Sequence, residues 1–107
     1  MTWLLLIVAG ALETVFAVAL KQSDGLSRIG WTALFLVAAA ASFTLLTVAL
    51  RDLPVGTAYA VWTGIGAVGT AIVGIVFLGD AATAARLGSI ALIVGGVVGL
   101  NLAGATH

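Results

Sequence analysis

Four long apolar runs, separated by short polar segments, account for almost the whole chain. They cover residues 3–20, 29–50, 55–78 and 84–104. A helix of about 20 predominantly apolar residues crosses the roughly 30 Å hydrocarbon core of a bilayer, and each run is near that length. The pattern therefore predicts an all-α membrane protein with four short transmembrane helices, which form a single domain over residues 1–107.

The segments that connect these runs are short and polar. They cover residues 21–28, 51–54 and 79–83. Because a connection this short leaves the two helices it joins side by side, we expect successive helices to be antiparallel neighbours. The N-terminus and the second connection then lie at one face of the membrane, and the first and third connections lie at the other.

Positive charge is distributed unevenly between these two faces. The face with the N-terminus has Arg51 as its only Lys or Arg, whereas the other face has Lys21, Arg28 and Arg86. The positive-inside rule would place the face with three such residues in the cytoplasm. A difference of two side chains is small, so the sequence is compatible with insertion in both orientations.

Composition agrees with a chain that lies in a membrane. Of the 107 residues, 63% are hydrophobic and 7% are charged, whereas a soluble domain has about 25% charged residues. The formal net charge is zero and no basic block is present, which argues against nucleic acid as a partner. The chain contains no cysteine, so disulfides and thiolate metal sites are excluded.

Glu13 lies within the first apolar run, whereas the other charged residues lie at or between the runs. A carboxylate near the bilayer centre costs about 2.5–3.5 kcal/mol on insertion scales, and such residues usually mark a proton or cation site. On the same helix side, Gly10 leaves room for a guest, and Phe16 offers an aromatic face to a cation. Glu13 is therefore the predicted substrate- and proton-binding residue. The alternative is a protonated Glu13 that is hydrogen-bonded to a neighbouring helix.

Ser42 ends a run of small residues near the middle of the second span. We expect its hydroxyl to hydrogen-bond Glu13 and to fix the orientation of the carboxylate. The alternative is a bond from the hydroxyl back to a carbonyl of its own helix.

The third span contains an aromatic pair and several glycines. Tyr59 and Trp62 are one helical turn apart and share a face with Gly66. At mid-membrane depth this pair is outside the usual interfacial belt, which favours a role as a binding-site wall. Gly64 and Gly66 weaken the helix locally and predict a kink or hinge.

The fourth span is rich in small residues, which let helix backbones approach each other closely in a membrane. Four helices per subunit have little room to enclose a hydrophilic pathway, so we expect an oligomer, of which a dimer is the simplest closed form. The predicted dimer interface contains Ser89, Gly95, Gly96 and Gly99.

Enzymatic chemistry finds no support in the sequence. The only histidine is the terminal residue His107, and neither a nucleophile–base set nor metal-ligand spacing is present. We therefore expect a protein that is not an enzyme and that requires no cofactor or metal.

Taken together, these features resemble the small multidrug resistance family over essentially the whole chain. The resemblance is carried by the four short spans, by Glu13, by the heptad-spaced Ser89 and Gly96, and by residues 53–67, which read Leu-Pro-Val-Gly-Thr-Ala-Tyr-Ala-Val-Trp-Thr-Gly-Ile-Gly-Ala. Residues 62–69, Trp-Thr-Gly-Ile-Gly-Ala-Val-Gly, are similar to the guanidinium-exporter subtype. The quaternary-ammonium subtype usually reads Trp-Ser-Gly-Val-Gly there.

This resemblance implies an antiparallel, dual-topology homodimer in the bacterial inner membrane. Such a protein is a proton-coupled antiporter that exports guanidinium, and short alkyl-guanidinium cations, by alternating access. Glu13 of both subunits would form the shared site, with Gly10 beside it. The resemblance also implies a hydrogen-bonded ring around the glutamates, formed by Ser42, Tyr59 and Trp62.

Two positions depart from the family pattern. Exporters of this subtype commonly have Trp where this chain has Phe16, and often Lys where it has Asn101. Both departures bear on how strictly the substrate is selected.

Four alternative functions remain open. The chain could be a broad exporter of quaternary ammonium compounds, which Phe16 would suit, or one half of a heterodimeric transporter, which the charge bias would suit. It could also be a non-transporting membrane subunit, or a flippase for a cationic lipid head group.

Overall fold

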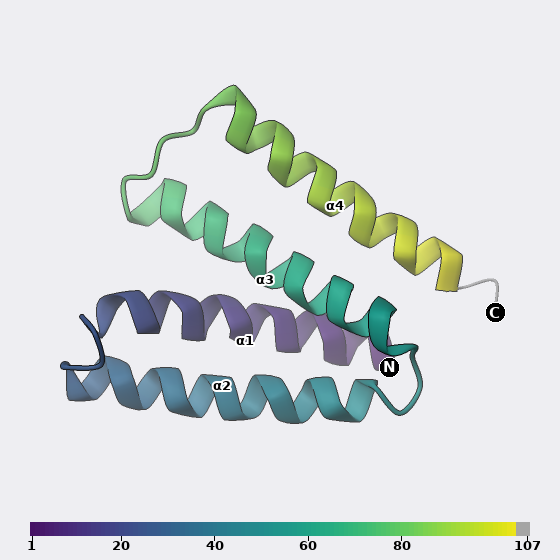
Figure 1. Ribbon diagram of the computed structural model, residues 1–107, viewed down its shortest axis with the longest axis horizontal. Helices are drawn as coiled ribbons and strands as arrows, with labels where there is room; N and C mark the ends of the chain where they lie inside the picture. The colour runs from purple at the N-terminus through teal and green to yellow at the C-terminus, as the bar shows by residue number, and fades with distance from the viewer. Residues whose placement is uncertain (105–107) are drawn as a thin grey trace.

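The computed structural model describes residues 1–104, which form four α-helices and no strand (Figure 1). The helices are α1 (Thr2–Gln22), α2 (Ile29–Ala49), α3 (Val55–Phe77) and α4 (Ala84–Gly104). All four are long and apolar enough to cross a membrane, which confirms the prediction of an all-α membrane protein. His107 lies outside the described residues.

The first loop is held by hydrogen bonds of Ser23, which is buried at the end of α1. The Ser23 hydroxyl donates to the Leu20 carbonyl at 2.7 Å and accepts from the Leu26 amide at 3.0 Å. The backbone then turns through positive φ at Asp24, Gly25 and Leu26 (51°, 72° and 70°). This tight turn reverses the chain, so α2 returns antiparallel to α1.

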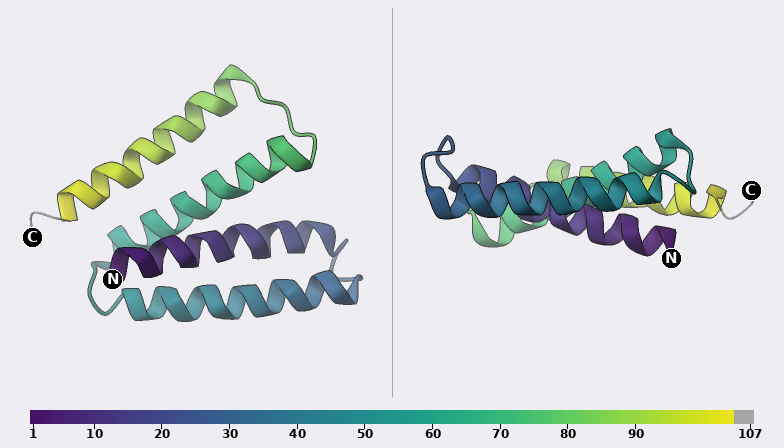
Figure 2. Two further views of the ribbon diagram at one scale, coloured as in Figure 1. Left: turned by 180° about the vertical axis from the view of Figure 1, so that it is seen from behind. Right: turned by 90° about the horizontal axis from the view of Figure 1, so that it is seen from below.

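The helices are arranged in space in the order α2, α1, α3, α4 (Figures 1 and 2). The pairs α1–α2 and α3–α4 are neighbours, as their short loops predict. α2 and α3 approach each other less closely than this prediction implies because α1 packs against both, and they meet mainly through side chains such as Ser42, Phe43 and Trp62. Two small buried residues of α1, Ala9 and Gly10, let both flanking helices approach α1 closely.

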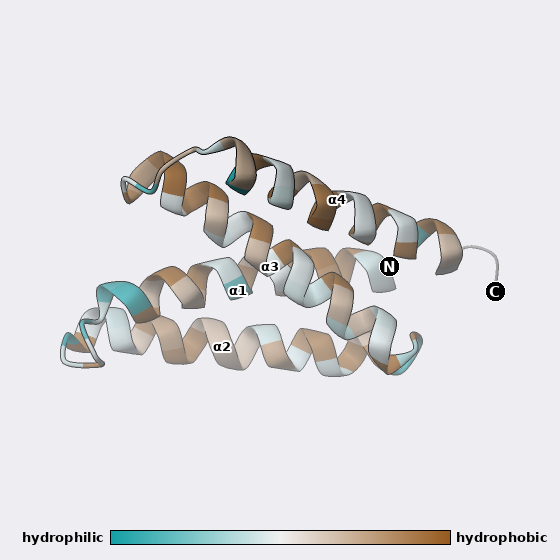
Figure 3. Ribbon diagram, turned by 45° about the horizontal axis from the view of Figure 1, so that its top comes forward, coloured by the Kyte–Doolittle hydropathy of each residue, from teal (hydrophilic) through white to brown (hydrophobic). Residues whose placement is uncertain are grey.

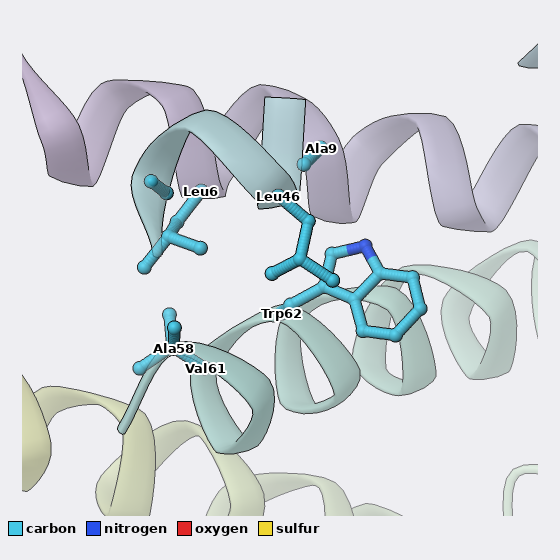
Figure 4. Close-up of a cluster of buried hydrophobic side chains, with 7 residues drawn as sticks. Leu6, Ala9, Leu46, Ala58, Val61 and Trp62 are labelled. Carbon is cyan, nitrogen blue, oxygen red and sulfur yellow. The ribbon is translucent and has the colours of Figure 1, made fainter. Parts of the chain in front are cut away.

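A small apolar core lies where α1, α2 and α3 meet (Figure 4). Its buried members are Leu6, Ala9, Leu46, Ala49, Ala58, Val61 and Trp62. α4 contributes none of them, and in its apolar segment no residue is buried. It packs only on α3, where a Cβ at Gly64 would meet the side chains of Val97 and Ile93.

The protein is close to one layer of helices in thickness. Its principal extents are 45 × 34 × 17 Å, and a helix with side chains is about 10–12 Å across. Many large apolar side chains are consequently exposed, and hydrophobic colours follow all four helices in Figure 3. One copy of the chain therefore forms an open row of helices rather than a closed bundle.

A hydrogen bond ties the N-terminus to the loop between α2 and α3. The Thr2 hydroxyl donates to Oδ2 of Asp52 at 2.9 Å. The N-terminus and Arg51 therefore lie at one end of the helices, and Lys21, Arg28 and Arg86 lie at or near the opposite end. This arrangement agrees with the small charge bias that the sequence predicts.

Candidate functional site

Glu13 lies midway along α1, on the side that faces α3. A Cβ at Gly66 of α3 would overlap the Glu13 carboxyl group, so the two residues are in direct contact. Oε1 of Glu13 is buried and has no hydrogen-bond partner within residues 1–104. A buried polar atom without a partner is costly, especially in hydrocarbon. The carboxyl group is therefore available to hold a proton or a cation.

Ser42 links all three core helices one turn away from Glu13. Its hydroxyl donates to the Ala9 carbonyl of α1 at 2.7 Å and accepts from Nε1 of Trp62 on α3 at 2.9 Å. We expected this hydroxyl to bond Glu13, or else a carbonyl of its own helix, and it does neither. The reason is that Ala9 precedes Glu13 by one turn and packs against α2, where Ser42 is fully buried. Ser42 therefore fixes Trp62 and the packing of α1, not the carboxylate directly.

An aromatic row crosses the same region. The ring of Phe16 on α1 stacks on Phe43 of α2 with centroids 6.0 Å apart, and Phe43 lies 5.3 Å from Trp62 of α3. Tyr59 contacts Trp62 edge to face at 5.9 Å. Phe43 and Tyr59 are about half exposed, at 50% and 45%. The structure thus brings together the three predicted aromatic residues and adds Phe43, which the sequence analysis missed.

Phe43 was missed because it is adjacent to Ser42 in sequence. Neighbouring residues on a helix point in different directions, so the pattern that selects Ser42 gives no reason to select Phe43. Only the position of α2 against α1 shows that Phe43 lies between Phe16 and Trp62.

The glycines near the site provide close helix packing. A Cβ at Gly10 would overlap the side chain of Ile65, so the space that the sequence suggested beside Gly10 is filled by α3. α3 is one continuous helix through Gly64 and Gly66, and the predicted hinge there stays a prediction. In this conformation Gly64 admits α4, and Gly66 admits the Glu13 carboxyl group.

Thr14 is a second residue that the sequence analysis missed. Its hydroxyl oxygen lies 3.4 Å from the Gly10 carbonyl of its own helix and 3.3 Å from the Gly66 carbonyl of α3. The same Gly66 carbonyl accepts a bond from the Thr70 hydroxyl at 2.7 Å. The Thr14 hydroxyl packs against Gly69 of α3, in the space that a side chain at this position would occupy. A hydroxyl residue directly after the membrane-embedded acid was the sequence feature that could have indicated it.

The predicted interface residues of α4 lie apart from the Glu13 site. An added Cβ at Gly95, Gly96 or Gly99 would meet no other atom within 4 Å. The Ser89 hydroxyl donates to the Ala85 carbonyl of its own helix at 2.7 Å. This face of α4 is therefore open in one copy of the chain.

The site as a whole offers one carboxyl group, an aromatic row and a few hydroxyls. Within residues 1–104, no three His, Cys, Asp or Glu side chains come together as metal ligands would. The chemistry that these residues support is reversible binding of a proton or of a small organic cation.

Comparison with known proteins identifies one matching family and relatives that align with almost the whole chain. The Small Multidrug Resistance protein family matches residues 1–93. A protein of Yersinia pestis named "Guanidinium exporter" is 56% identical over 103 residues, which are 96% of this chain and 99% of that protein. An Escherichia coli protein of the same name is 54% identical over 107 residues and covers 100% of both chains. A third, from Salmonella typhi, is 53% identical over 102 residues, which are 95% of this chain and 97% of that protein.

Proposed function

This chain belongs to the small multidrug resistance family, and we propose that it exports guanidinium cations in exchange for protons. It is a multi-pass protein of the bacterial inner membrane, since its relatives are bacterial and its four apolar segments are helices. Spanning proteins of the bacterial outer membrane are β-barrels instead. Its relatives are named as exporters, which favours a transporter over an enzyme.

The observation that carries the proposal is the Glu13 carboxyl group, in the middle of α1 and with one oxygen buried and unpartnered within the described chain. A carboxylate can neutralise its charge in a membrane by taking a proton or by pairing with a cation, but one group does not hold both. Release of the proton on one side then allows cation binding, and the reverse happens on the other side. Alternating access of this group to the two sides is therefore sufficient for antiport.

The open row of helices supports a second copy as the missing part of the site. A protomer 17 Å thick leaves the side of the row uncovered, and α4 presents an open glycine face. A homodimer would close the row and bring two Glu13 residues to a shared site. The two carboxyl groups would then repel each other and titrate as a coupled pair.

Guanidinium fits this site better than a quaternary ammonium ion does. Its N–H groups lie in a plane and match carboxylate oxygens in paired hydrogen bonds, whereas a tetraalkylammonium ion has no donor. Its flat face can also stack on aromatic rings such as Phe16 and Trp62. Phe16 presents an apolar edge to the substrate, which we expect to tolerate a short alkyl group on the guanidinium.

Purified protein in liposomes is expected to accumulate guanidinium when a pH gradient is imposed. Short alkyl-guanidiniums should be transported at comparable rates. Tetraethylammonium should be transported at no more than about one tenth of the guanidinium rate, because it has no N–H group to form charge-assisted hydrogen bonds with the carboxylate. The measurement is radiolabelled uptake or the exchange current. Phe16→Trp should narrow the range by rejecting the alkyl-substituted cations.

Equal or faster transport of tetraethylammonium would instead favour a quaternary-ammonium exporter. The apolar stack of Phe16 and Phe43 is the observation that favours this second candidate function. Failure of this chain alone to transport any cation, with transport restored by a second chain, would favour one half of a heterodimer.

The dimer is expected to be antiparallel. The chain has no cysteine, so Ala82→Cys in the loop before α4 and Gly56→Cys at the start of α3 each give one labelling site, at opposite ends. Neither change alters the charge bias. Each variant should react with an impermeant maleimide from both sides of the membrane in comparable amounts. If each variant is labelled from one side only, and the two variants from opposite sides, all copies of the chain have the same orientation in the membrane.

A further inference from the structure

We propose that Thr14 is a positioning residue that holds Glu13 in register against α3, an inference that rests on the proposed role of Glu13 in binding cations. The Thr14 hydroxyl reaches the Gly66 carbonyl at 3.3 Å, and the Glu13 carboxyl group packs on the same glycine. Gly66 of α3 thus both accepts the hydrogen bond from Thr14 and contacts the Glu13 carboxyl group. We call this hydrogen bond between α1 and α3 the tie.

Two successive residues of α1 rest on two glycines of α3. The Glu13 carboxyl group occupies the space beside Gly66, and the Thr14 hydroxyl occupies the space beside Gly69. Gly66 and Gly69 are one turn apart, so both contacts exist together only in one register of the helices. A slide or rotation of α1 that displaces Thr14 therefore displaces Glu13 as well.

The bond between Thr14 and Gly66 can break without leaving an unsatisfied group in the membrane. The Thr14 hydroxyl also lies 3.4 Å from the Gly10 carbonyl of its own helix, which can accept its hydrogen bond instead. The Gly66 carbonyl keeps the bond from Thr70 at 2.7 Å. Since an unsatisfied polar group in hydrocarbon is costly, these alternative partners suit a tie that opens and closes while α1 moves against α3.

The geometry of the tie also suits exchange. At 3.3 Å the bond is longer than a usual O–H···O bond, and one proton is shared between two carbonyls at similar distances. The contact thus specifies a register without fixing it permanently, as a helix that moves during transport requires.

The test compares Thr14→Val, which keeps the shape but loses the hydroxyl, with Thr14→Ser, which keeps the hydroxyl. The dissociation constant for guanidinium of the folded, purified protein should rise roughly three- to tenfold in Thr14→Val, the effect of one interhelical hydrogen bond. It should stay within about twofold of the unmutated value in Thr14→Ser. Thr47→Val is the matched control, because Thr47 is exposed and bonds only the Phe43 carbonyl of its own helix.

A second readout does not depend on the substrate. Glu13 is the only glutamate in the chain, so ¹³C-labelled glutamate gives one side-chain carboxyl resonance per subunit in the NMR spectrum. The pH midpoint of this resonance should shift in Thr14→Val and return in Thr14→Ser. A lower protein yield with an unchanged midpoint and unchanged affinity would overturn the positioning role and leave Thr14 with packing alone.

These results separate the two proposals. If the unmutated protein binds no guanidinium, the proposed function fails, and the NMR titration still decides whether Thr14 positions Glu13. If guanidinium binds and both readouts are the same in Thr14→Val as in the unmutated protein, only the inference about Thr14 fails.

Discussion

Glu13→Gln is expected to abolish the accumulation of guanidinium driven by a pH gradient. Glutamine keeps the size and the hydrogen-bonding groups of the side chain, but it neither titrates nor carries the charge that pairs with a cation. The loss of a charged hydrogen-bonding partner alone corresponds to about a tenfold to hundredfold loss of affinity. Exchange coupled to protons should fall to the level of empty liposomes, measured as uptake against the guanidinium gradient.

Asp24→Asn is the matched control for Glu13→Gln. It neutralises a carboxylate in the exposed first loop, where the positive φ of 51° suits asparagine. Acidic loop residues contribute little to membrane orientation, so uptake should stay close to that of the unmutated protein. Accumulation by Glu13→Gln under the same gradient would show that another group carries the protons.

Gly66→Ala is expected to fold but to bind guanidinium at least about tenfold more weakly, because the added Cβ would overlap the Glu13 carboxyl group. The side chain of Glu13 is flexible and can move aside, so the helices need not separate. The substitution then displaces the Glu13 carboxylate that binds the cation, and it leaves the helix packing intact. Isothermal titration of purified protein with guanidinium measures this loss.

Gly56→Ala is the control for the change from glycine to alanine in the same helix. A Cβ at Gly56 would meet no other atom within 4 Å, and alanine is the better helix former by about 1 kcal/mol. This variant should bind guanidinium normally. If Gly66→Ala binds normally but exchanges slowly, Gly66 acts as a hinge, as its sequence context predicts, and its contact with Glu13 is incidental.

Much of the fold could be predicted because the membrane restricts the possible structures. Backbone groups in hydrocarbon must be satisfied within the chain, so apolar runs of this length are helices. Helical spacing also predicted that Tyr59 and Trp62 share a face, and their rings are in contact. Loop length also predicted the α1–α2 and α3–α4 pairs, but it could not show that α1 packs between α2 and α3.

What the sequence did not predict concerns contacts between helices. Spacing shows which residues share a face, but not which residue of another helix they meet. Ser42 was assigned to Glu13 and bonds Ala9 and Trp62 instead. Gly66 was interpreted as a flexible point, whereas in this conformation its missing side chain makes room for the carboxylate.

The attachment of α4 through α3 alone has an evolutionary consequence. α4 adds no buried residue to the core, against which its Val97 and Leu100 pack, and an added Cβ at Gly95, Gly96 or Gly99 would meet no other atom within 4 Å. If α4 forms the proposed dimer interface, substitutions in α1, α2 and α3 can alter the choice of substrate while that interface is retained. In the same case, substitutions in α4 can alter the choice of partner subunit while the choice of substrate is retained. A lineage that duplicates such a gene can diverge in either property separately.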